Sequence, residues 1–193
     1  MPNDTTNRLT LRGSNVEVAR FRDENKSYEL DDAGVRLPLS FETLVPTPPE
    51  MLGDNSIQDG EMPSWYSWRV ENWGTKWDAY DCMDWVNPAP EGRSPTEEDR
   101  LNWLHLNWNM ETPNVLGFYT AWSPPVPWLL AVSEKYELKF MLEYADEGGG
   151  FVGYVIVIDG VIEKQEDLPW DSLDGKALRM SLGNYDYEDM EEV

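Results

Sequence analysis

The sequence predicts a single domain that combines α-helices with β-strands. With 193 residues, of which 40% are hydrophobic and 12% aromatic, the chain is long enough to bury one core. Short alternating or apolar runs bounded by turn residues predict strands, and three segments join a helix start signal to apolar residues at helical spacing. The pair Asp159-Gly160 between two apolar runs predicts a β-hairpin. These observations favour the α+β class.

The predicted strands are short and lie mostly in the second half of the chain. A polar–apolar alternation that ends at Gly13 predicts the first of them, and apolar residues on both sides of the stretch 101–108 predict a strand covered on both faces. The predicted strands span residues 7–13, 76–86, 101–108, 115–122, 137–144 and 151–158, with a final hairpin strand after residue 160.

Three helices are predicted from their end signals. Ser14 or Asn15 is expected to cap the first helix. Pro63 is expected to begin the second helix and Gly74 to end it. The predicted helices span residues 16–22, residues 63–72 and a segment after Ser123 whose buried stripe contains Trp128, Leu129 and Val132.

The end of the chain is predicted to lie outside the domain. Residues 1–165 are expected to form the domain, interrupted by an insertion over residues 87–99, and residues 166–193 a polar extension. The extension ends in a tail with five acids and no base, expected to be disordered or to act as an interaction tail. These acids are Asp186, Glu188, Asp189, Glu191 and Glu192.

Tryptophan is concentrated in the middle of the chain. Nine of the ten Trp residues lie between Trp65 and Trp128. Because each indole ring buries a large area, this segment is expected to belong to the core or to one aromatic surface.

Cysteine usage and hydropathy limit the kind of protein this is. Cys82 is the only cysteine, which excludes a disulfide within the chain and a cysteine-ligated zinc or iron–sulfur site. No apolar stretch approaches the length of a membrane span, and the first ten residues lack the apolar core of a signal peptide. We therefore expect a soluble cytoplasmic protein without a cofactor.

The charge predicts the kind of partner. The net charge is −22, and the excess is uneven: residues 1–36 carry six bases against seven acids, whereas residues 37–193 carry nine against thirty. Such a field repels nucleic acids and anionic membranes and attracts basic protein surfaces. The alternative is that the charge only keeps the protein soluble.

Several blocks, in order along the chain, resemble the Api92-like/YubB family of phage, prophage and plasmid proteins. The blocks are N-R-L-T-L at 7–11, W-R-V-E-N-W-G-T-K-W-D-A at 68–79, T-A-W-S-P-P at 120–125, and E-Y at 143–144 ahead of G-F-V-G at 150–153. The resemblance runs from about residue 7 to residue 160. It implies a ferredoxin-like βαββαβ core with inserted loops and an extra C-terminal hairpin strand, and it implies no chemistry. Family members often carry a Trp-Cys pair before the first strand; Asp4-Thr5-Thr6 stands here instead, so no role of that Cys is carried over.

The second block contains the best candidate for a binding surface. Gly74 allows a left-handed turn after the predicted helix, and Lys76 is a lone base among acids. The tryptophans could stack on a base or pack against a peptide. The candidate binding residues are Asn72, Trp73, Lys76, Trp77 and Trp122. The alternative is a helix end whose tryptophans belong to the core.

No catalytic or metal site is predicted. Asp78, Asp81 and Asp84 are spaced by three and would share a face only on a helix, whereas a strand is favoured here. His105, the only histidine, is expected to be structural. Cys82 is a poor nucleophile because neighbouring carboxylates raise its pKa.

The triple glycine at 148–150 is interpreted as a hairpin turn, because it lacks the Lys-Ser/Thr and the helix of a phosphate-binding loop.

Three functions remain open at this point. The first is an accessory inhibitor that binds a basic host or defence protein by mimicking nucleic acid. The second is a nucleic-acid-binding module in which sheet aromatics stack on bases, with residues 1–36 as its only basic region. The third is a metal-dependent small-molecule enzyme. A plain structural role is the remaining interpretation.

Overall fold

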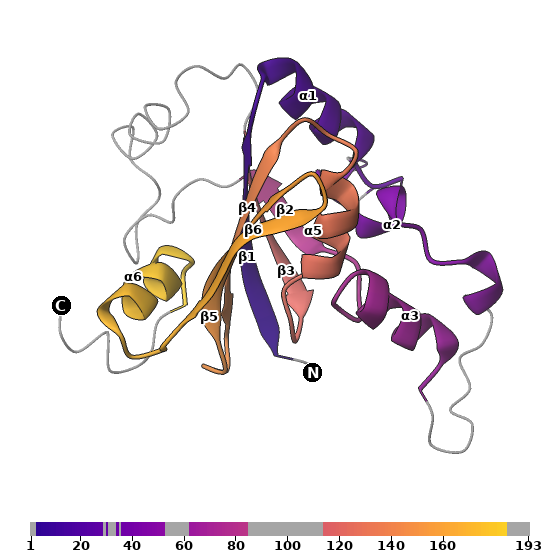
Figure 1. The fold of residues 1–193 in the computed structure, drawn as a ribbon. Helices are drawn as coiled ribbons and strands as arrows, with labels where there is room; N and C mark the ends of the chain where they lie inside the picture. Colours follow the sequence, from indigo (N-terminus) through magenta and orange to yellow (C-terminus); the bar gives the residue numbers. More distant parts are fainter. Residues whose placement is uncertain are drawn as a thin grey trace.

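The structure is a computed structural model that describes residues 3–28, 30, 34, 36–52, 62–84 and 114–184 (Figure 1). The predicted insertion at 87–99, the predicted strand at 101–108, His105 and the acidic tail lie outside the described residues.

The described strands form one antiparallel sheet with the order β2-β3-β1-β4-β5-β6. The strands are β1 (Asp4–Arg12), β2 (Tyr80–Asp84), β3 (Val115–Ala121), β4 (Lys139–Asp146), β5 (Val152–Ile158) and β6 (Val161–Leu168). β1 lies at the centre and pairs with both β3 and β4. The first four strands in this order, with three described α-helices between β1 and β2 and one between β3 and β4, contain the βαββαβ unit of a ferredoxin-like fold. The predicted fold class is confirmed, and β5 and β6 extend the sheet beyond it.

Helices cover both faces of the sheet (Figure 1). The described helices are α1 (Asn15–Glu24), α2 (Phe41–Leu44), α3 (Ser64–Asn72), α5 (Val126–Ser133) and α6 (Leu173–Ser181), with a short 3-10 turn over Pro49–Met51. The first four lie on one side of the sheet and α6 lies on the other. Among the described helices, none has the length and apolar character needed to cross a bilayer.

The two faces of β1 explain why polar and apolar residues alternate at the start of the chain. Leu9 and Leu11 on β1 are fully buried on the side of α1, whereas Arg8 points to the side of α6 and pairs with Glu143 at 2.7 Å. The hydroxyl of Ser14 then accepts the N–H of Glu17 at 3.2 Å and caps α1, as predicted.

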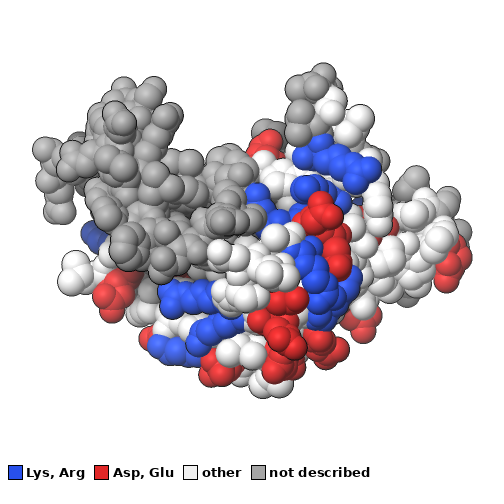
Figure 2. Space-filling view, turned by 90° about the horizontal axis from the view of Figure 1, so that it is seen from above, with Lys and Arg blue, Asp and Glu red and all other residues white. Residues whose placement is uncertain are grey.

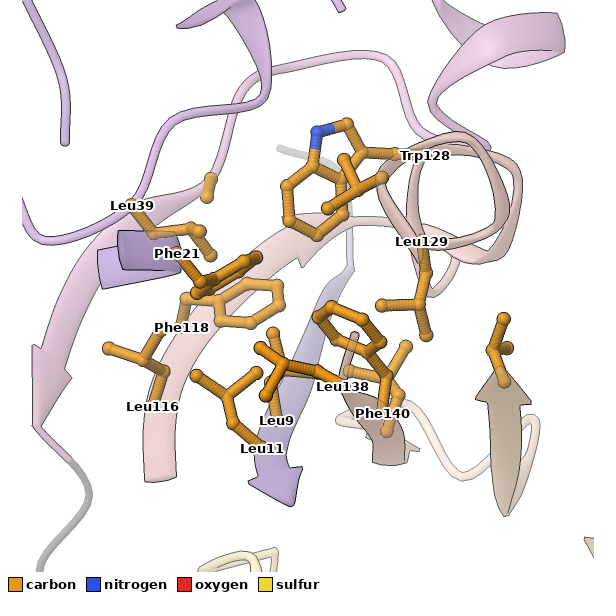
Figure 3. Packing of buried hydrophobic residues seen from close by; sticks show 14 of the residues in the cluster. Leu9, Leu11, Phe21, Leu39, Leu116, Phe118, Trp128, Leu129, Leu138 and Phe140 are labelled. Carbon is orange, nitrogen blue, oxygen red and sulfur yellow. The ribbon is translucent and has the colours of Figure 1, made fainter. Parts of the chain in front are cut away.

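Aromatic rings fill the main core between the sheet and α1, α2 and α5 (Figure 3). Phe21 of α1 lies 5.5 Å from Phe140 of β4, with the rings edge to face. Trp128 of α5 is fully buried, and its ring lies 4.7 Å from Phe41 of α2. The predicted inner face of α5 is therefore observed, and it closes over the middle of the sheet.

A second, smaller core lies under α6. Its buried residues are Val115, Ala145, Val152 and Leu182. Ser172 caps α6 by accepting the N–H of Gly175 at 3.0 Å.

The predicted boundary at residue 165 differs from the structure. It falls inside β6, and α6 packs on the sheet where a polar extension was expected. The reason is that α6 docks through few apolar side chains and through Arg179, which is only 1% exposed and lies 4.8 Å from the ring of Trp170. A buried arginine gives no apolar signal in a sequence.

The two turns that join the last three strands match their predictions. Asp159 and Gly160 both have positive φ, 48° and 72°, as a two-residue hairpin turn requires. The triple glycine lies between β4 and β5, where a carboxylate oxygen of Asp146 accepts the N–H of Gly150 at 2.9 Å. β6 forms the outer edge of the sheet, and seven of its eight residues are exposed.

Candidate binding site

Two turns that are distant in sequence are joined side by side in the structure. One follows α3 and leads to β2, and the other follows β3 and leads to α5. The hydroxyl of Thr75 donates to the carbonyl of Ala121 at 2.9 Å, and the hydroxyl of Ser123 donates to the carbonyl of Gly74. Two of the four sequence blocks on which the family resemblance was based, at 68–79 and 120–125, therefore meet in space.

Gly74 allows this close approach. Its φ is +85°, a left-handed conformation that ends α3, and its N–H donates to the carbonyls of Arg69 and Val70. A Cβ atom at this position would lie 2.6 Å from Pro127 Cδ and 3.0 Å from the carbonyl oxygen of Pro124. Only glycine fits without a shift of the second turn, so the two turns hold a fixed relative position.

Three aromatic rings lie around the ammonium of Lys76 at the two joined turns. The Lys76 Nζ atom lies 4.7 Å from the ring centroid of Trp77, 5.1 Å from that of Trp122 and 5.8 Å from that of Tyr66. Each distance is within the range of a cation–π contact. We call these four residues the aromatic–lysine cluster. Trp77 is 37% exposed and Trp122 is 44% exposed, so two large rings of the cluster face solvent.

Trp122 holds an unusual backbone conformation. Its φ is +69°, a value that large non-glycine residues rarely adopt. Its N–H donates to the carbonyl of Asn3 at 3.0 Å, and the adjacent hydrogen bond from Thr120 to the carbonyl of Ser123 closes the turn at 2.8 Å. These contacts hold the indole ring out toward Lys76. Backbone strain of this kind is concentrated at functional positions.

The structure brings together only some of the predicted binding residues. Trp73 is fully buried, and its indole N–H donates to the carbonyl of Val45 at 2.8 Å. The amide of Asn72 donates back to the carbonyl of Trp68 at 2.9 Å. Both residues lie at the end of α3, and Trp73 belongs to the core, as the alternative interpretation proposed for it, whereas Lys76, Trp77 and Trp122 form the cluster. Tyr66 was missed because its approach depends on how α3 meets the two turns.

Of the three aspartates that could have formed a metal site, Asp78 and Asp81 have described side chains, and these have different surroundings. The carboxylate of Asp78 accepts from the Ser40 hydroxyl at 2.6 Å and from the N–H groups of Phe41 and Ala79. Burial raises the pKa of Asp78, although these hydrogen bonds favour its ionised form. Asp81 is exposed on β2. Within the described ranges, no group of three or more His, Cys, Asp or Glu side chains could hold a metal ion.

Cys82 lies in an environment that suppresses the thiolate. Burial, and after it the charges of Asp78 and Asp81, raise the pKa of Cys82 to about 12. The raised pKa was predicted, although burial rather than charge is its main cause. The Cys82 thiol donates to the carbonyl of Leu39 at 3.7 Å.

Many of the basic side chains pair with the chain's own carboxylates. Arg20 pairs with both Glu17 and Glu24, and Lys26 pairs with Asp23. Basic and acidic side chains accordingly lie next to one another on the face shown in Figure 2, which includes the end of the molecule with α1. Among the residues that the structure describes, the bases with ion pairs include Arg8, Arg20, Lys26, Arg69, Lys135, Lys139 and Lys164.

Fold and site together define a ferredoxin-like protein that carries an exposed aromatic cluster. Residues 104–191 match a family model described as the ferredoxin-like domain in Api92-like protein, so the resemblance to the Api92-like family is confirmed for this part of the chain. The match includes α6, which the sequence had placed outside the resemblance. Comparison with curated proteins and with solved structures finds no match.

Proposed function

We propose that the protein is an acidic protein-binding module, encoded by a mobile element such as a phage or plasmid. In this proposal it acts in the cytoplasm and inhibits a basic, nucleic-acid-binding protein of the host or of its defences by charge mimicry. Its carboxylates take the place of phosphates, and the aromatic–lysine cluster anchors the contact.

The observation that carries the proposal is the internal pairing of the bases. The chain has 37 acids and 15 bases. Because Arg8, Arg20, Lys26 and others are paired within the chain, they do not form a continuous basic surface. The excess carboxylates remain to generate the field that a partner meets. Such a field speeds the association of a basic partner and weakens as salt is added.

The exposed tryptophans supply a second element of a protein interface. Trp and Tyr dominate the binding energy of many interfaces because they bury large areas with few rotatable bonds. Trp77 and Trp122 are exposed on turns that hydrogen bonds and Gly74 hold in place. An anchor that is already ordered loses little conformational entropy on binding.

The nucleic-acid-binding alternative depends on the basic residues of the N-terminal segment. Three of them, Arg8, Arg20 and Lys26, each lie beside a carboxylate, which lowers the net positive charge that phosphate contacts would meet. We therefore favour a basic protein as the partner.

The test is a capture experiment followed by kinetics. The full chain is used to capture proteins from a bacterial lysate at low salt, and each captured protein is purified and its association rate constant measured at about 0.05 M and about 0.5 M salt. We expect a basic, nucleic-acid-binding partner whose association slows at least about tenfold at the higher salt.

Two results would oppose this function. A partner whose association rate does not change with salt would contradict charge mimicry. A gel shift of single-stranded nucleic acid by the protein alone at low salt would instead support the nucleic-acid alternative. The matched variant is the double substitution Trp77→Ala and Trp122→Ala, which should speed dissociation while leaving the salt dependence of association in place.

A further inference from the structure

We propose that Tyr66, Trp77 and Trp122 form an aromatic cage for the ammonium group of a lysine side chain on the partner, and that Lys76 occupies this cage in the free protein. The inference rests on the proposed function, because it identifies the chemical group that the binding site receives.

The cage already holds a cation. Aromatic faces attract ammonium groups through their quadrupoles, and protein sites for lysine and methylated lysine use two or more rings around one cation. Here three rings lie within 5.8 Å of the same Lys76 Nζ atom. The chain's own side chain thus shows which chemistry the three rings accommodate.

Lys76 is held in a way that permits exchange. Among the described residues it has cation–π contacts and no ion pair with a carboxylate. Its four-carbon stem is flexible, and the ammonium is readily rehydrated once it leaves the rings. A partner lysine can therefore replace it without leaving a buried charge unpaired.

The rings themselves are fixed and reachable. Trp77 and Trp122 belong to the two turns that Thr75 and Ser123 join by hydrogen bonds, and both rings are more than one-third exposed. The left-handed backbone at Trp122 directs its ring toward Lys76 rather than into the core. The strain at this residue is explained if the ring serves a contact outside the fold.

The net charge favours the same occupant. A chain with a net charge of −22 concentrates cations near its surface, so a lysine-rich partner is drawn toward the cage before contact.

The experiment removes the resident cation and offers a replacement. The full-length Lys76→Ala variant and the original protein are titrated with tetramethylammonium chloride at constant ionic strength, while the indole N–H signals of Trp77 and Trp122 are followed by NMR. We expect the variant to bind the probe about three- to thirtyfold more tightly than the original protein, because the internal competitor is gone. A peptide with one lysine should shift the same two signals.

Matched controls distinguish specific binding of a cation from non-specific binding to a hydrophobic surface. tert-Butanol has nearly the shape of the probe but no charge, and it should leave both signals unmoved. Adding Trp122→Ala to the variant should abolish the response. Lys76→Gln serves as a second variant, and far-UV circular dichroism verifies that each variant is folded.

A folded Lys76→Ala variant that does not respond to tetramethylammonium, or that responds equally to tert-butanol, would overturn the inference. The two proposals fail separately. A cage that binds the cation in a protein that captures no basic partner would remove the proposed function and keep the cage. A salt-dependent partner whose affinity is unchanged by Trp122→Ala would keep the function and remove the cage.

Discussion

The buried and the exposed tryptophans of this protein differ more in surroundings than in sequence position. Trp73 and Trp77 are four residues apart, yet the first is fully buried against Phe41 and the second is 37% exposed beside Lys76. Trp122 and Trp128 show the same contrast around α5, with 44% and 0% exposure. Each joined turn, taken with the helix beside it, thus contributes one ring to the core and one to the surface.

This difference indicates that the tryptophans in and beside the joined turns have two roles, one in the core and one on the surface. The members that face inward fill volume, so their loss should destabilise the fold. Those that face outward lie on a surface that the fold does not need. The predictions below test this division, beginning with the core.

Trp128→Ala should have the largest effect. It removes a fully buried ring that packs against Phe41, and the free energy of unfolding should fall by about 3–5 kcal/mol. Urea unfolding followed by circular dichroism measures this loss. Trp128→Phe is the matched control: it keeps much of the ring and removes an indole N–H that has no acceptor among the described residues, so it should cost less than half as much. Equal losses in the two variants would mean that the indole N–H matters.

Gly74→Ala should have the next largest effect. The new methyl group would meet Pro127 Cδ and the carbonyl of Pro124, at a backbone angle that disfavours alanine. We expect a loss of about 1–3 kcal/mol in the free energy of unfolding, together with changed NMR signals of the Trp77 and Trp122 indoles. Gly34→Ala is the control, because it also has positive φ but no described atom lies within 4 Å of the new methyl group. If both variants lose the same stability, the backbone angle and not the contact with the second turn is responsible.

Two substitutions of Trp122 distinguish the cost of its backbone conformation from the contribution of its side-chain contacts to stability. Trp122→Ala keeps a side chain at positive φ, whereas Trp122→Gly relieves it, so the glycine variant should be about 1 kcal/mol more stable than the alanine variant. Thermal unfolding of both variants measures the difference. Both should lie close to the original protein, in contrast to Trp128→Ala. A loss as large as that of the core variant would show that Trp122 supports the fold.

The smallest effect is expected from a surface carboxylate. Lys135, Tyr136 and Arg20 lower the pKa of Glu24 from 4.5 to about 2. Because the pKa in the folded protein is below its ordinary value, the stabilisation is present above pH 4.5 and is lost as the pH falls toward 2. Glu24→Gln should therefore lower the melting temperature slightly at neutral pH and not at about pH 2. Lys135→Met, which removes the largest cause, should reproduce part of this pattern; a difference that is the same at every pH would contradict it.

Much of the fold could be predicted from the sequence because local signals agree with tertiary structure there. The Ser14 cap, the alternation of β1 and the Asp159-Gly160 turn each depend on neighbours in sequence. The strand order was implied by the family resemblance and not by spacing, because pairing across the sheet leaves little local trace.

The parts that could not be predicted depend on contacts between distant segments. α6 is held by Arg179 on Trp170 and by a small apolar core, so its own residues look like a surface extension. In the same way, the two joined turns decide that Trp73 is buried and that Tyr66 approaches Lys76. Binding residues therefore could be nominated from the sequence but not sorted into core and surface.

The outer strand β6 also governs how copies of the protein behave in concentrated solution. An unpaired strand invites another strand to pair with it, which is a common start of aggregation. β6 carries three acids, Glu163, Glu166 and Asp167, against the single base Lys164. Two such edges would bring acids close to acids, and like charges on neighbouring strands repel. Crowding alone should therefore leave the molecules dispersed, even though Val161 and Ile162 are exposed on this edge.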